Sequence, residues 1–163
     1  MRFVKTSAVA AALFILCSGF ATTALSNDLI VVASDAAYEA AQEWVGYLEI
    51  HEVPLKHVTP QDFKAHEKEP YVVMMGGLDE QDGIKELAEE ILSEDELKRV
   101  SQNGVGETYF KFKVWDPMQT VIMFVGSDMA AAEEARIKSK ENWWNTFILW
   151  FDIEAEMEGF HVY

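Results

Sequence analysis

The chain has 163 residues, half of them apolar, so its composition excludes an intrinsically disordered protein. Its 28 acidic and 13 basic residues give a formal net charge of −15 at pH 7. A charge of this size and sign repels phosphate backbones and anionic lipid headgroups, which argues against nucleic-acid binding. Cationic partners and divalent cations remain open, as does a role of the charge in solubility alone.

The first 26 residues have the pattern of a secretory signal peptide. A short basic segment precedes an apolar run over residues 8–20, and small residues follow as far as Ser26. The run is short for a membrane span, so cleavage before Asn27 is favoured over a retained membrane anchor. We therefore expect an exported protein, in the periplasm, at the cell surface or in the medium, with residues 27–163 as a single domain.

The remainder of the chain alternates between buried strands and amphipathic helices. Apolar runs predict strands buried on both faces at residues 29–33, 71–75 and 120–125. A helical pattern follows each run, at residues 35–49, 83–92 and 128–140. This alternation predicts an α/β fold of three layers, in which helices cover both faces of a mostly parallel sheet of four to five strands.

Shorter patterns complete the expected fold. Residues 53–58 predict a further strand, and a short helix starting at Pro60 should follow it. Alternation over residues 108–115 is typical of a half-exposed strand at a sheet edge, which we expect to be antiparallel. Ser93 and Glu96 match a capping box at the start of another short helix.

Candidate binding residues lie in the loops that follow the three buried strands. In an open parallel sheet such loops meet at the carboxyl edge, where ligands bind. The expected site comprises Ser34, Asp35, Gly76, Gly77, Asp79, Ser127 and Asp128. Its three aspartates predict a site for a divalent cation or a polar ligand, since hard cations take several carboxylate oxygens. The alternative is that each aspartate only stabilises the N-terminus of a helix.

Familiar catalytic and nucleotide-binding motifs do not occur in the sequence. Gly76-Gly77 is not part of a Gly-x-Gly-x-x-Gly motif, and no Walker-type Gly-Lys-Ser/Thr is present, so we expect no nucleotide ligand or cofactor. Neither Ser34 nor Ser127 has an assignable base. These observations favour a non-catalytic binding or structural module; the alternative is a metal-binding protein or a metal-dependent enzyme that uses the acidic loops.

A helical segment rich in aromatic side chains begins at Asn142. It contains Trp143, Trp144, Phe147, Trp150 and Phe151, which occupy two adjacent stripes of a helix. Either one stripe packs on the sheet and the C-terminal tail partly covers the other, or the helix presents a patch to an envelope protein or a glycan. A homo-oligomer that buries the helix is a third possibility.

Two segments resemble units of exported cell-surface modules. Residues 71–77 form an apolar strand ending in Gly-Gly, with an acid and an amphipathic helix after it, and residues 120–130 lead from a buried strand through Gly-Ser-Asp into a helix. These units are similar to parts of bacterial cell-wall-binding repeats and of Rossmann-like domains in archaeal S-layer-associated proteins. The resemblance implies a binding or structural module of the cell envelope without catalytic residues.

Overall fold

The computed structural model describes residues 28–79 and 83–153. The predicted signal peptide and its cleavage site near Ser26 lie outside the described residues. Within the described ranges, no helix combines the length and apolar character that crossing a bilayer requires.

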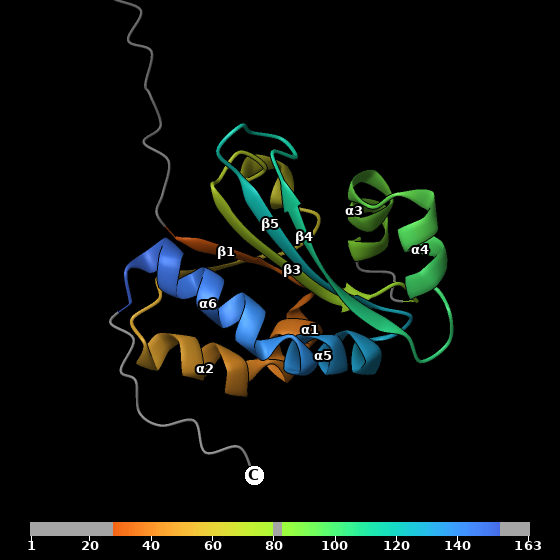
Figure 1. Ribbon diagram of the computed structural model, residues 1–163, viewed down its shortest axis with the longest axis horizontal. Helices are drawn as coiled ribbons and strands as arrows, with labels where there is room; N and C mark the ends of the chain where they lie inside the picture. Colours follow the sequence, from red (N-terminus) through yellow and green to blue (C-terminus); the bar gives the residue numbers. More distant parts are fainter. Residues whose placement is uncertain (1–27, 80–82, 154–163) are drawn as a thin grey trace, which may run out of the picture.

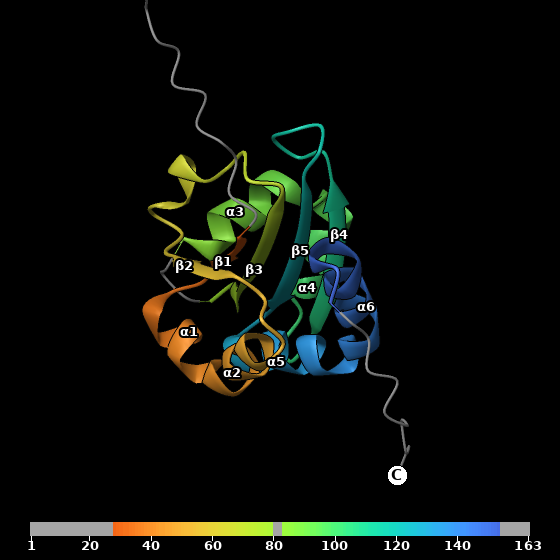
Figure 2. The same ribbon diagram turned by 90° about the vertical axis from the view of Figure 1, so that its left-hand side faces the viewer.

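Five strands form one sheet in the order β2-β1-β3-β5-β4 (Figures 1 and 2). The strands are β1 (Leu29–Val32), β2 (Leu55–Val58), β3 (Tyr71–Gly77), β4 (Gly106–Phe112) and β5 (Thr120–Gly126). All pairings are parallel except that of β4 with β5, so the predicted sheet with one antiparallel edge strand is confirmed. Because β1, β3 and β5 run in the same direction, their carboxyl ends lie at one edge of the sheet.

Helices cover both faces of the sheet, which gives the predicted three layers. Figure 1 shows α3 (Ile84–Ile91) and α4 (Glu94–Val100) on one side of the sheet. The helices on the other side are α1 (Asp35–Ala40), α2 (Gln42–Ile50), α5 (Met129–Lys138) and α6 (Lys140–Phe151). Each face carries its own cluster of buried apolar side chains, so the sheet is the shared wall of two cores.

Glycines allow α5 to lie close against the sheet. Gly77, Gly126 and Gly106 are neighbours in register across β3, β5 and β4. A Cβ atom on Gly106 would lie 1.9 Å from the carbonyl oxygen of Ala131, and one on Gly126 would lie 2.4 Å from the backbone nitrogen of Ala132. The backbone of α5 therefore occupies the space in which side chains from this row of glycines would stand.

The helices differ from the sequence prediction in two places. The single helix expected over residues 35–49 is divided at Ala41 into α1 and α2. The short helix expected at Pro60 is a turn followed by one 3-10 turn (Phe63–Ala65). In the turn, the Thr59 hydroxyl donates to the Asp62 carboxylate at 2.9 Å and accepts from the Asp62 amide at 3.3 Å. Such local bonds give the backbone an alternative to helical pairing.

Candidate functional site

A surface hollow of about 310 Å³ lies at the carboxyl ends of β3 and β5, beside α3 and α4. It is lined by Leu78, Asp79, Lys85, Glu89, Leu97, Ser101 and Ser127. Its volume is at the lower end of the range for small-molecule sites. Its position is the one at which open parallel sheets bind their ligands.

The end of β3 positions one side of this hollow. The amide of Leu78 donates to the carbonyl of Gly126 at 2.8 Å, which extends the contact between β3 and β5 by one residue. A Cβ on Gly76 would lie 2.8 Å from the side chain of Ile84, so this glycine lets α3 pack closely against the strand. Asp79 Oδ1 lies 2.7 Å from the place that a Cβ on Gly77 would take, so the carboxylate folds back over this glycine.

Three charged side chains border the hollow without neutralising one another through an ion pair. Lys85 and Glu89 are four residues apart on α3 and therefore share one face of the helix. Along the described part of the chain, the side chains of Asp79, Lys85 and Glu89 form no ion pair or hydrogen bond. One cation and two anions are thus left to interact with solvent or with a ligand.

The two hydroxyl groups at the hollow are engaged in local hydrogen bonds. Ser101 Oγ donates to the carbonyl of Leu97 at 2.6 Å, and Ser127 Oγ accepts from the amide of Gly104 at 2.9 Å. Ser127 Oγ also donates to the carboxylate of Asp128 at 3.5 Å, and this carboxylate accepts from the amide of Ala131 at 2.8 Å. This arrangement lacks the close nucleophile–base contact that an activated serine needs.

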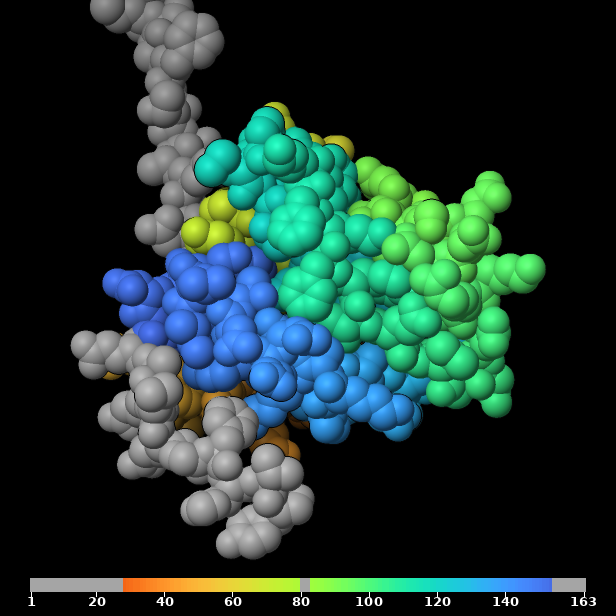
Figure 3. Space-filling model, viewed as in Figure 1, coloured from red at the N-terminus to blue at the C-terminus, as the bar shows by residue number. Residues whose placement is uncertain are grey.

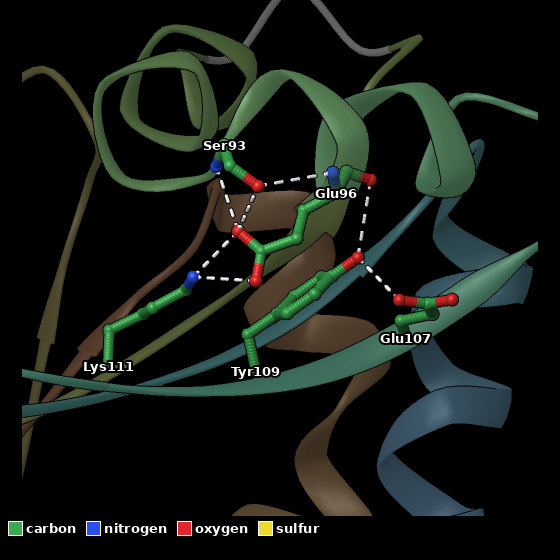
Figure 4. Close-up of polar contacts among 5 residues, drawn as sticks. All are labelled: Ser93, Glu96, Glu107, Tyr109 and Lys111. Atoms are coloured by element: carbon green, nitrogen blue, oxygen red, sulfur yellow. Dashed lines mark hydrogen bonds and ion pairs between the residues drawn. The ribbon is translucent and has the colours of Figure 1, made fainter.

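A polar network fixes α4, which forms the other wall of the hollow, to the edge strand β4 (Figure 4). Lys111 Nζ donates to both carboxylate oxygens of Glu96 at 2.7 Å. The amide of Ser93 donates to the same carboxylate at 2.8 Å, so the predicted capping box is confirmed. Beside it, the Tyr109 hydroxyl donates to Glu107 Oε2 at 2.5 Å and lies 3.3 Å from the carbonyl oxygen of Glu96.

The network holds its groups in fixed protonation states. The hydrogen bonds from Lys111 and from the Ser93 amide lower the pKa of Glu96 to about 2. Burial, together with the hydrogen bond to Glu107, raises the pKa of Tyr109. Glu96 is therefore charged and Tyr109 protonated at neutral pH, which suits a structural tie between helix and strand better than proton transfer.

We expect Glu96→Gln to lower the free energy of unfolding by about 1 kcal/mol at pH 7, since it removes a partly exposed ion pair and weakens the helix cap. The pKa of Glu96 is lower in the folded than in the unfolded chain. Its stabilising contribution is therefore present above pH 4.5 and is lost as the pH falls from 4.5 towards 2. Urea unfolding at pH 7 and pH 3 should show the difference from wild type shrinking at the lower pH.

The matched control for this experiment is Glu39→Gln, which changes an exposed glutamate on α1. It should leave stability within about 0.5 kcal/mol of wild type at both pH values. A Glu96→Gln effect that is the same at pH 7 and pH 3 would contradict the role assigned to the carboxylate.

The residues predicted at the carboxyl edge have different surroundings, although Asp79 Oδ1 and the backbone of Asp128 both lie 2.7 Å from the place that a Cβ on Gly77 would take. Asp79 and Ser127 line the hollow. Ser34 accepts from the amide of Ala37 at 3.1 Å as the N-cap of α1, and Asp35 lies exposed in the first turn of that helix. Ser34 and Asp35 thus stabilise the N-terminus of α1, which was the alternative to a role in a ligand site.

Asp128 and the two glycines also have structural roles. Asp128 is the N-cap of α5. Gly76 and Gly77 provide room for α3 and α5 on opposite faces of β3. Within the ranges that the structure describes, no group of three or more His, Cys, Asp or Glu side chains is arranged to hold a metal ion.

The partner surface predicted for α6 is wrong for two of its five aromatic residues. Trp143 and Phe147 are fully buried in the core between α6 and the sheet, where Trp143 contacts Trp44 of α2, Phe124 of β5 and Phe147. The sequence had left two alternatives for this helix, and these two residues follow the one in which a stripe of aromatic side chains packs on the sheet. They cannot contact a partner while the domain is folded.

The remaining aromatic residues of α6 are half-buried. Trp144 packs beside Tyr47 at a ring-centroid distance of 5.1 Å, and Trp150 stacks on Tyr71 at 4.8 Å. Phe151 also contacts Tyr71, at 5.3 Å. The outer surface of α6 can be seen in Figure 3, and the large apolar side chain it exposes is Leu149. The helix is thus mainly a core element.

Five lining residues of the hollow were missed by sequence reasoning: Leu78, Lys85, Glu89, Leu97 and Ser101. Leu78 directly follows β3, and the other four belong to α3 and α4, for which the sequence predicted helices but no role in a site. A signal was present, because Lys85 and Glu89 carry opposite charges at i,i+4 spacing on the helix that follows Gly76-Gly77. The contribution of α4 had no such signal, since it depends on how that helix folds back over the sheet.

No protein-family model, curated protein or solved structure matches the chain. The resemblance to cell-wall-binding and S-layer-associated modules is therefore carried by the short motifs of the sequence alone.

Proposed function

We propose that this chain is a non-catalytic binding module that acts outside the cytoplasm, in the cell envelope or the extracellular space. The observation that carries the proposal is the hollow at the carboxyl ends of β3 and β5, which is lined by unpaired charges, hydroxyl groups and two leucines. Sites for small ligands typically combine an apolar lining with a few polar groups that orient the ligand.

Binding is favoured over catalysis by the state of the groups at the hollow. Ser101 Oγ donates to a backbone carbonyl at 2.6 Å, and the hydrogen bond from Ser127 Oγ to the Asp128 carboxylate is long, at 3.5 Å, for proton abstraction. The lining residues include neither histidine nor cysteine. The charged side chains that remain are suited to recognising a charged ligand.

Action outside the cytoplasm is supported by the signal-peptide pattern of residues 1–26. Expression of the full chain in a bacterial host, followed by fractionation and N-terminal sequencing, tests this part of the proposal. We expect mature protein that begins at Asn27 in the periplasmic or extracellular fraction. Full-length protein retained in the cytoplasm would overturn it.

Binding at the hollow can be tested without knowing the ligand. A chemically diverse set of small polar compounds is titrated into isotope-labelled mature protein, and amide shifts are followed by NMR. We expect saturable shifts that cluster at Leu78, Lys85 and Ser127. The variant Ser101→Trp, which places a large side chain at the rim of the hollow, should abolish them.

Lys56→Met is the control, because Lys56 is exposed on β2, which lies at the opposite edge of the sheet from β4. It should leave the shifts unchanged. Saturable binding that maps elsewhere on the molecule, or the absence of any saturable shift across the set, would refute the assignment of the hollow as the binding site.

A further inference from the structure

We infer that the hollow recognises a small zwitterion, an α-amino acid with an apolar side chain. The inference rests on the proposed function, because it names the ligand class of the same site. It follows from three properties of the hollow: the arrangement of its charges, its apolar surface and the charge of the whole molecule.

The charges at the hollow match the two ends of an amino acid. Lys85 offers a cation to a carboxylate, and Asp79 and Glu89 offer anions to an ammonium group. Lys85 and Glu89 share a helix face, and side chains at this spacing lie about 6 Å apart at their Cβ atoms. A ligand whose ammonium and carboxylate are attached to one carbon atom can therefore contact both.

The apolar part of the lining fits the rest of such a ligand. Leu78 and Leu97 enter the hollow from β3 and α4, and both are half-buried. An aliphatic side chain placed against them would be removed from water, which stabilises the complex through the hydrophobic effect. The volume of about 310 Å³ limits the ligand to a small molecule.

The overall charge of −15 favours a zwitterion over an anion. An anionic ligand is repelled by the molecule as a whole, whereas a zwitterion carries no net charge and interacts only with the local groups. A simple cation is attracted but meets Lys85 at the site. The ligand that satisfies all three charged side chains carries both signs.

The test compares L-leucine with two analogues that each lack one charged group. Isoamylamine has the side chain and ammonium of leucine without the carboxylate, and 4-methylpentanoate has the carboxylate without the ammonium. Titration of the mature protein by NMR should show leucine binding at least about 10-fold more tightly than either analogue, since each analogue lacks one charge-assisted hydrogen bond.

Two variants test the contributions of Lys85 and Glu89 to binding one at a time. Lys85→Met should weaken leucine binding about 10-fold and leave isoamylamine unchanged, because only the carboxylate contact is lost. Glu89→Gln should weaken leucine and isoamylamine and leave 4-methylpentanoate unchanged. Lys56→Met should alter none of the three. A general loss of folding would weaken all ligands together and is recognised in the amide spectrum.

The results distinguish this inference from the proposed function. If other compounds of the diverse set give saturable shifts at the hollow and leucine does not, the zwitterion assignment is overturned and the binding site stands. Equal affinity for leucine and both analogues overturns it as well. If no compound binds at the hollow, both proposals fail.

Discussion

Replacing Trp143 by alanine should lower the free energy of unfolding by about 3–5 kcal/mol, which is the usual cost of removing a buried tryptophan. Trp143 is fully buried and packs against Trp44, Phe124 and Phe147. Its indole nitrogen also donates to the carbonyl of Arg136 at 2.8 Å, and the variant leaves that oxygen without this donor. Thermal unfolding followed by circular dichroism should show a midpoint lower by roughly 10–20 °C.

The control is a second apolar residue of the same helix that lies at the surface. Leu149 is 83 % exposed, so Leu149→Ala should change stability by no more than about 0.5 kcal/mol. A Trp143→Ala variant as stable as Leu149→Ala would show that α6 does not pack on the sheet. The aromatic surface predicted from the sequence would then have to be reconsidered.

Gly106→Ala should destabilise the protein by about 3 kcal/mol, the upper part of the range for overpacked sites. The added methyl group would stand 1.9 Å from the carbonyl oxygen of Ala131. That atom belongs to the backbone of α5, so relief requires a shift of the whole helix away from β4 and β5. Urea unfolding of the variant and the wild type measures the difference directly.

Gly46→Ala is the matched control, because it makes the same chemical change where there is room. Apart from its chain neighbours and the backbone of its own helix, no heavy atom lies within 4 Å of a Cβ built on Gly46, which is in the middle of α2. Alanine is favoured over glycine inside a helix, so this variant should gain about 0.5–1 kcal/mol. The two substitutions should therefore change the free energy of unfolding in opposite directions. A Gly106→Ala variant as stable as the wild type would contradict the close packing of α5.

The sheet could be predicted from the sequence because its central strands have an unambiguous pattern. Residues 29–33, 71–75 and 120–125 are apolar without interruption, as strands covered on both faces must be. The caps at Ser34 and Ser93 were predictable for a related reason, since each depends on a bond between residues three apart.

The edge strand was harder to predict because its burial depends on distant helices. The alternation over residues 108–115 predicted a strand, but β4 begins at Gly106 and ends at Phe112. Lys113 has a φ of 58°, which turns the chain before the predicted end. Tyr109 is buried while Phe112 is 67 % exposed, because α4 covers the first and no such cover reaches the second.

The candidate site was predictable only where it is formed by loops. Asp79 and Ser127 follow from the rule that ligands bind at the carboxyl edge of a parallel sheet. Leu97 and Ser101 do not, because α4 is held beside the hollow by the contacts of Glu96 with Tyr109 and Lys111 of β4. Those contacts join residues 13 and 15 positions apart in the chain, and a local pattern does not show which of them pair.

The row of glycines across β3, β5 and β4 also bears on how related sequences should be interpreted once they are aligned with this one. Gly77, Gly106 and Gly126 each stand where a methyl group would strike the backbone of α5, so replacing a side chain on that helix relieves none of the clashes with its main chain. Selection should hold these positions as glycine whatever the domain binds. If these glycines are invariant among related sequences, the reason would be the close packing of α5 on the sheet. Differences at Lys85 and Glu89 would be the better indication that a related protein binds another ligand.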